Sequence, residues 1–162
     1  MVLAAAGVGG LVHRWAALYG DRTGVSTTVT YFHLAGVLVA GGFAVVTDRA
    51  SLRLPQTDGP EQVRQLDEIA SVHRWVLGGL ALTLVTGLLM LLSDLDTYLH
   101  SAVFWTKMGL IAMLLGNGYV RLRSETALRA GLEAWRRFRW TSIASLALWF
   151  AVLLAGTMLM SS

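Results

Sequence analysis

An uncharged stretch of 22 residues, Val25 to Val46, constrains the fold of this chain more than any other feature. At a rise of about 1.5 Å per residue, a helix of this length crosses a hydrocarbon core of roughly 30 Å. The whole chain has 162 residues, of which 55% are hydrophobic and only 14% are charged. Soluble domains are about 25% charged. The sequence therefore predicts an integral membrane protein.

Three further apolar stretches follow the first one, and polar segments separate them. We predict four membrane-spanning helices, at about 26–47, 69–92, 99–120 and 140–160. Short connections make successive helices antiparallel, so the expected fold is all-α, an integral membrane antiparallel four-helix bundle in residues 25–162. Residues 1–24 lack the positively charged start of a signal peptide, and their apolar run is too short to span. We expect them to form an N-terminal interfacial segment on the outer side of the membrane.

Positive charge predicts the orientation of the spans. The outer side would carry Arg14 and Arg22, whereas nine of the 13 lysines and arginines fall in the first and third connections. Since positively charged connections stay in the cytoplasm, we expect a multi-pass protein of the cell inner membrane with both termini outside. The nine are Arg49, Arg53, Arg64, Arg121, Arg123, Arg129, Arg136, Arg137 and Arg139.

Composition narrows the possible chemistry and partners. The chain contains no cysteine, which excludes disulfides, iron–sulfur clusters and thiolate metal sites. The pI of about 9.8 would suggest nucleic-acid binding in a soluble protein, but here the arginines are explained by topology. We therefore expect contact with membrane lipid and no nucleic acid.

His33 and Lys107 are the ionisable side chains that lie deepest in the predicted spans. Each lies about eight residues below the outer surface, which is roughly 12 Å along a helix axis. An ionisable group at this depth is costly and marks a candidate functional site. The helix face that carries His33 continues with small side chains, which admit another helix or a flat cofactor: Gly36, Val37, Ala40 and Ala44.

Two interpretations of each residue stay open. His33 is either a neutral imidazole bonded to a carbonyl or hydroxyl of a neighbouring helix, or an axial ligand of haem iron. Lys107 either extends its ammonium group to the lipid headgroups or points into the bundle. No Asp or Glu lies at its depth in the spans, so a cofactor carboxylate or an anionic substrate would then supply the negative charge.

Two further histidines are weaker candidates. His100 lies at the outer end of the third span, seven residues before Lys107, and so would share a helix face with it. It is a candidate second axial ligand or propionate contact, or a surface histidine. His73 belongs to the tetrapeptide VHRW, which occurs at 12–15 and again at 72–75. It is a candidate cofactor contact near the inner surface, or it meets lipid phosphates there.

These residues resemble a known group of membrane proteins. The first span, with His33, Gly41-Gly42 and Arg49, resembles the first helix of the HemJ-type protoporphyrinogen oxidases. The third span, Phe104-Trp105-Thr106-Lys107-Met108-Gly109-Leu110, resembles their third helix. The stretch from Lys107 to Asn117-Gly118-Tyr119-Val120-Arg121 is also similar to CopD-type copper-resistance proteins. The resemblance covers residues 30–123 and implies a four-helix bundle that holds haem b, with His33 and Lys107 at positions those oxidases need.

The leading hypothesis is a haem-b-binding membrane protein that acts in electron transfer or oxidoreduction at the outer side. His33 would be an axial ligand and His100 a candidate second one. Lys107 would hold a propionate or a porphyrin-like anionic ligand, and quinone is a candidate electron acceptor. Whether the chain is an enzyme stays open; if it is, we expect a haem-dependent oxidoreductase. The alternatives are a non-catalytic anchor or scaffold, as a homo-oligomer or a subunit of a larger complex, and CopD-like copper transport.

Overall fold

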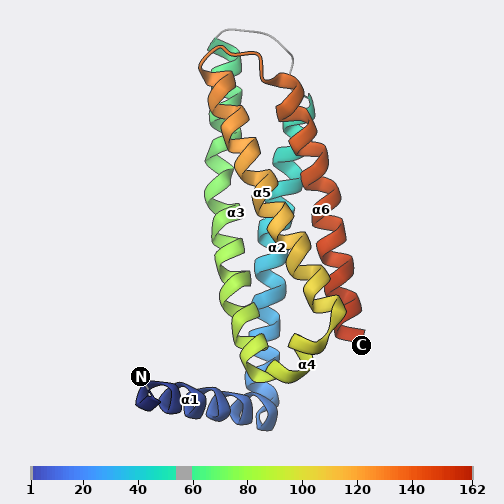
Figure 1. Cartoon of the computed structure of the whole chain (residues 1–162). Helices are drawn as coiled ribbons and strands as arrows, with labels where there is room; N and C mark the ends of the chain where they lie inside the picture. The colour runs from blue at the N-terminus through green and yellow to red at the C-terminus, as the bar shows by residue number, and fades with distance from the viewer. Residues whose placement is uncertain (1, 54–59, 162) are drawn as a thin grey trace.

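The computed structural model describes residues 2–53 and 60–161, and these residues form six helices and no strand (Figure 1). The predicted all-α class is therefore confirmed. In chain order the helices are α1 (Val2–Asp21), α2 (Thr23–Arg53), α3 (Pro60–Ser93), α4 (Leu95–His100), α5 (Ala102–Arg129) and α6 (Trp135–Ser161).

Four long helices, α2, α3, α5 and α6, alternate in direction, so the start of α2 and the end of α6 lie at the same end of the molecule (Figure 1). We call this end the α4 end, because α1 and α4 also lie there, and the opposite end the arginine-rich end. Among the described residues, α2, α3 and α6 are long and apolar enough to cross a membrane. These three helices indicate an integral membrane protein.

The helix that we predicted as the third span differs from the expectation. It begins at Ala102, because Ser101 adopts an extended conformation that ends α4, and its hydroxyl accepts a hydrogen bond from the Phe104 amide. The apolar sequence of α5 is also interrupted by Lys107 and Asn117, and the helix is not among the three candidate spans. Four spans are therefore not confirmed.

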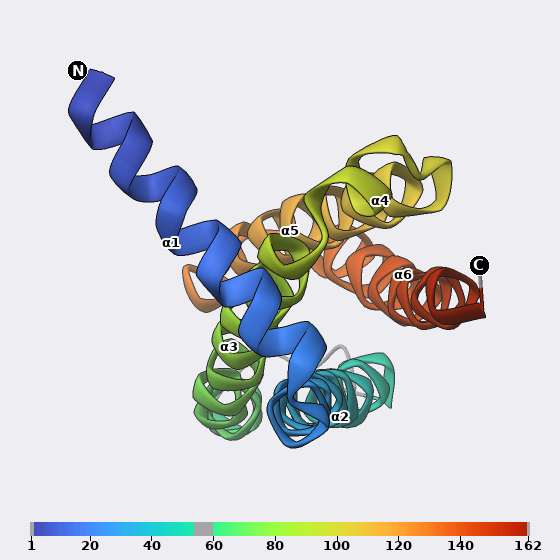
Figure 2. The ribbon, with the colours of Figure 1, turned by 90° about the horizontal axis from the view of Figure 1, so that it is seen from below.

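The long helices pack as two pairs (Figure 2). α2 lies along α3 and α5 lies along α6, while contacts between α2 and α6 join the pairs. The backbones of α3 and α5 hardly approach each other. The predicted antiparallel four-helix bundle is therefore not confirmed, because α3 and α5 do not pack along each other.

Glycines allow α2 and α3 to pack very closely. A Cβ atom on Gly79 would lie 2.6 Å from the Ala40 backbone nitrogen, and one on Gly36 would lie 2.9 Å from the Gly79 carbonyl oxygen. Neither distance is possible for a real side chain, so both positions require glycine. The stripe of small residues next to His33 is thus covered by a helix, which is one of the two occupants that the sequence allowed.

Buried apolar side chains concentrate in the middle of the molecule and at the arginine-rich end. The middle cluster consists of Ala40, Ala44, Leu114 and Trp149. At the arginine-rich end, a second cluster joins α3, α5 and α6, and it consists of Leu66, Leu128 and Phe138. Among the side chains that the structure describes, no third cluster of this kind lies at the α4 end. The two helix pairs are therefore held together mainly at and above mid-height in Figure 1.

The N-terminal helix α1 lies across the α4 end, at a large angle to the long helices (Figures 1 and 2). It packs on α3 and α2. Its Trp15 indole N–H donates a hydrogen bond of 2.7 Å to the Leu89 carbonyl oxygen on α3. The segment 1–24 is thus largely helical, and its position on a membrane surface stays a prediction.

Candidate functional site

His33 lies half-buried on α2 and faces α3. Its Nδ1 atom is 3.1 Å from the Thr86 hydroxyl oxygen. Its Cε1 atom is 3.1 Å from the place that a Cβ atom would take on Gly87, so Gly87 leaves room for the imidazole. This contact has the form of the simpler interpretation, an imidazole bonded to a hydroxyl of the neighbouring helix.

The hydrogen bonds of Thr86 assign the proton on His33. The Thr86 hydroxyl lies 2.7 Å from the Leu82 carbonyl oxygen and donates its single proton there. It therefore accepts a hydrogen bond from His33, which assigns the proton to Nδ1 and leaves Nε2 with a lone pair. Histidines that ligate a metal through one nitrogen donate the other N–H in this way. The contact with Thr86 is therefore compatible with both interpretations of His33.

Lys107 lies half-buried on α5, near the α4 end. Its Nζ atom is 3.8 Å from the place of a Cβ atom on Gly156 of α6. Its charge is close enough to His33 to act on that side chain electrostatically. Within the described ranges, none of the ion pairs includes Lys107. The ammonium group therefore lies beside α6 without an ion-pair partner among the described residues.

His100 does not join this pair. It lies exposed on α4, and its Nδ1 atom is 2.7 Å from the Asp96 carbonyl oxygen of the same helix. The predicted helix face shared by His100 and Lys107 is wrong, because the break at Ser101 puts the two residues on different helices.

His73 lies far from this group on α3. It is half-buried and 13 residues from Thr86, the partner of His33, which is roughly 20 Å along the helix axis. The structure thus brings His33 and Lys107 into one region and leaves His73 and His100 outside it.

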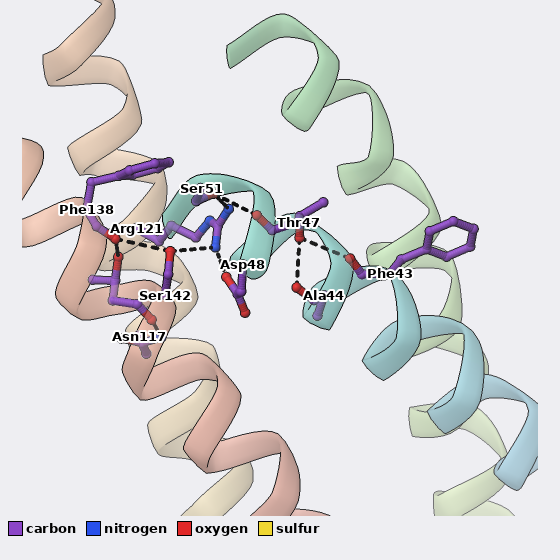
Figure 3. A network of polar contacts seen from close by, with 10 residues as sticks. Phe43, Ala44, Thr47, Asp48, Ser51, Asn117, Arg121, Phe138 and Ser142 are labelled. Atoms are coloured by element: carbon purple, nitrogen blue, oxygen red, sulfur yellow. Dashed lines mark hydrogen bonds and ion pairs between the residues drawn. The ribbon is translucent and has the colours of Figure 1, made fainter. Parts of the chain in front are cut away.

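A buried polar network lies at the arginine-rich end (Figure 3). Arg121 of α5 forms an ion pair with Asp48 of α2, and their side chains are only 7% and 1% exposed. Arg121 also donates hydrogen bonds to Ser51 at 2.8 Å and to Ser142 of α6 at 3.2 Å. One guanidinium group therefore ties three helices together, with both of its terminal nitrogens engaged.

The aromatic ring of Phe138 completes the surroundings of this guanidinium group. The Arg121 Cζ atom lies 5.2 Å from the ring centroid, within the range of a cation–π contact. Nearby, the Asn117 amide donates to the Thr141 carbonyl oxygen at 2.8 Å and so joins α5 to α6. Polar and aromatic contacts thus replace water around a charge that the fold has buried.

Further charges continue this network toward the surface. Glu125 lies within electrostatic range of Arg121 and accepts a 3.0 Å hydrogen bond from Arg129. Arg129 in turn donates to Asp67 of α3 at 2.5 Å, and this bond is the main reason why the pKa of Arg129 is raised. Charges of alternating sign therefore join α2, α5 and α3 at this end.

One carboxylate oxygen of Asp48 is buried without a hydrogen-bond partner in the described part of the chain. Among the described residues, its Oδ2 atom is the only buried side-chain nitrogen or oxygen without a hydrogen-bond partner. Buried polar atoms are normally paired, and a carboxylate oxygen can be satisfied by an internal water.

Sequence reasoning missed this network. It counted Arg121 among the arginines that set topology and ended the first span just before Asp48. The signal was present as helical spacing: Asp48 and Ser51 continue the buried face of Ala40 and Ala44 on α2. On α5, Arg121 is followed by Ser124 and Glu125 on the same face, and all three are buried.

The described residues line two hollows at the arginine-rich end. One has about 920 Å³ and lies between the ends of α2 and α5 and the start of α6, and the other has about 480 Å³ and lies beside α5. Neither includes His33 or Lys107. Across the residues that the structure describes, no three histidine or carboxylate side chains converge on a common metal position.

Near the α4 end, His33 and Lys107 are the predicted site residues that the structure brings into one region. Among the described residues, no other histidine joins them. Comparison with known proteins adds nothing to this geometry: no family model matches the sequence, and neither curated proteins nor solved structures give a match.

Proposed function

We propose that this chain is a membrane protein that binds haem b near the α4 end, between the α2/α3 pair and the α5/α6 pair. The observation that carries the proposal is the ammonium group of Lys107, which is half-buried and has no anionic partner among the described residues. A buried charge of this kind is costly unless a ligand compensates it. A carboxylate of the cofactor would do so.

Each residue has a distinct role in this proposal. His33 offers the Nε2 lone pair as a single axial ligand, while Thr86 fixes the ring by accepting the Nδ1 proton. Lys107 binds a propionate, and Gly156 leaves space for its side chain. Haem b would supply one-electron transfer, with a membrane quinone as a candidate acceptor.

The topology that we propose has four spans, with α5 as the most polar of them. α5 has 28 residues, about 42 Å at the helical rise, and it packs along α6, which is itself a candidate span. The positively charged connections would face the cytoplasm, so both termini would lie outside the inner membrane.

Absorption spectra test the proposal directly. The full chain, produced in haem-replete cells and purified in mild detergent, is expected to show a Soret band and, after dithionite reduction, the sharp bands of haem b. His33→Ala should abolish these bands, and Lys107→Met should lower the haem retained. His73→Ala is the matched control, because it removes a histidine at the other end of α3. A colourless preparation, or an unchanged spectrum after His33→Ala, would refute the proposal.

A second candidate is a non-catalytic anchor for a larger membrane complex, and it has its own supporting observation. His33 is already bonded to Thr86, and the small residues beside it are already covered by α3. This candidate predicts a colourless protein that is stable in detergent and co-purifies with a partner subunit. Metal analysis of the same preparation tests the CopD-like alternative, which requires bound copper.

A further inference from the structure

The larger hollow at the arginine-rich end has a lining of unusual composition. It lies between the end of α2, the end of α5 and the first turns of α6, and has a volume of about 920 Å³. Its charged lining consists of Arg136, Arg139 and Glu133, so positive charge is in excess. The remaining side chains are mostly large and apolar, and they are Leu52, Leu128, Leu132, Trp135, Trp140 and Ile143.

Arg139 is held at this hollow by the backbone. It donates a 3.4 Å hydrogen bond to the Leu52 carbonyl oxygen at the end of α2, so one of its nitrogens is oriented by the fold. Arg136 lies one helical turn earlier and is exposed. Two guanidinium groups on one helix face can bind the oxygens of a single phosphate from two sides.

An apolar stripe leads from these arginines along α6. Trp140 and Ile143 line the hollow, and Phe150 and Leu154 continue the same helix face toward the α4 end. These four side chains are 62%, 45%, 66% and 62% exposed. Since α6 is apolar enough to span a membrane, the stripe is suited to contact with an acyl chain, and Trp140 lies where the arginines begin, as interfacial tryptophans do.

We propose that this hollow binds the phosphate headgroup of an anionic phospholipid, with one acyl chain along the stripe. Two features favour a lipid over a free anion: the lining is largely apolar, and the stripe continues it for several turns. Basic hollows between helices at a membrane interface bind anionic headgroups through the same charge complementarity. The site lies at the opposite end from His33 and Lys107, so it does not depend on the proposed haem.

Native mass spectrometry of the purified full chain tests this site. The protein is titrated in detergent with phosphatidylglycerol, with phosphatidylcholine of the same chain length, and with inorganic phosphate. The informative variant is Arg136→Gln with Arg139→Gln. Its matched control is Arg49→Gln with Arg137→Gln, which removes two exposed arginines that do not line the hollow. Arg136→Gln alone leaves the Arg139–Leu52 bond intact and guards against loss of local structure.

We expect the wild-type protein to retain phosphatidylglycerol in preference to phosphatidylcholine. Loss of both lining arginines should weaken phosphatidylglycerol binding roughly 30-fold, and loss of Arg136 alone roughly fivefold. The control pair should change binding less than about twofold. An equal loss in the control pair would overturn the proposal in favour of diffuse surface charge. Equal retention of both lipids, or displacement of the lipid by millimolar phosphate, would also overturn it.

Discussion

At the arginine-rich end, Arg121 is buried against Asp48, Ser51 and Ser142, whereas near the α4 end Lys107 lies beside Gly156 without an anion among the described residues. Both are basic side chains of α5 that point toward α6. They lie 14 residues apart, which is roughly 21 Å along the helix. The first is compensated by the fold, and the second is not.

This difference separates structural charge from functional charge. A buried ion pair whose charges face each other, with most of its hydrogen bonds made, holds a fold together and leaves little capacity for a further charged ligand. An uncompensated buried charge lowers the stability of the fold, and proteins keep such charges where a ligand or substrate interacts with them. We therefore place the structural polar centre at Arg121 and the candidate binding site at Lys107. Variants at Asp48, Gly79, Lys107 and Thr86 test this division.

The largest effect is expected from Asp48→Ala. It removes the carboxylate next to Arg121 and should lower the free energy of unfolding by about 3–5 kcal/mol, because the guanidinium group then stays buried without its partner. Unfolding by a denaturing detergent in mixed micelles measures this. Asp96→Ala, at an exposed carboxylate of α4, should cost less than about 0.5 kcal/mol.

The double variant Asp48→Leu with Arg121→Met sharpens this result. Replacing both charges by apolar side chains of similar size should recover most of the lost stability. A loss of less than about 1 kcal/mol in the Asp48→Ala variant would mean that the pair is not the structural centre described here.

The next effect concerns the contact between α2 and α3 beside His33. Gly79→Ala places a methyl group 2.6 Å from the Ala40 backbone nitrogen and should cost about 1–3 kcal/mol, because the two helices must separate. Gly78→Ala is the matched control, since nothing lies within 4 Å of its new Cβ atom. If both variants unfold alike in the same assay, the close approach of the two helices is contradicted.

Lys107→Met is expected to raise the stability of the protein, whereas the two preceding kinds of change lower it. In protein freed of any ligand, the variant should be as stable as wild type or more stable by about 1 kcal/mol, because an uncompensated charge has been removed. Lys107→Arg keeps the charge and should show no gain. A clear loss of stability in the Met variant would show that Lys107 has a structural partner, and the contrast with Arg121 would disappear.

The smallest effect is expected from Thr86→Val. It removes the acceptor of the His33 Nδ1 proton and should cost about 0.5–1.5 kcal/mol. The tautomer of His33 in the wild-type protein is reported by the ¹⁵N chemical shifts of the imidazole, and we expect the form protonated at Nδ1. Thr106→Val is the control, because its exposed hydroxyl bonds only the Ala102 carbonyl of its own helix. A wild-type imidazole protonated at Nε2 would refute the assignment of the proton to Nδ1.

The helices themselves could be predicted well from the sequence, because uncharged runs of about 20 residues in this chain correspond to long helices. The break between α4 and α5 could not, since a single serine that both ends one helix and caps the next interrupts no hydrophobic pattern. As a result, His100 was assigned to the wrong helix.

Pairing between distant residues was the other limit. Asp48 and Arg121 are 73 positions apart, and nothing in either segment alone indicates that the two meet. The polar residues that follow each at helical spacing, such as Ser51 and Ser124, mark a polar face but not its partner. The depth of His33 and Lys107 in the membrane stays a prediction, because it follows only from their positions along the predicted spans.

The close seam between Gly36 and Gly79 also affects how the molecule can move. It fixes α2 and α3 as one rigid hairpin, while α5 and α6 form a second one. The middle cluster and the contacts around Phe138 and Arg121 fasten the two hairpins from mid-height to the arginine-rich end. Relative motion of the two hairpins would then be smallest around Arg121 and largest near the α4 end, where Lys107 and His33 lie. Spin labels at Leu34 and Leu154, both exposed, would report this motion as a change in the distance between the two labels when a ligand binds.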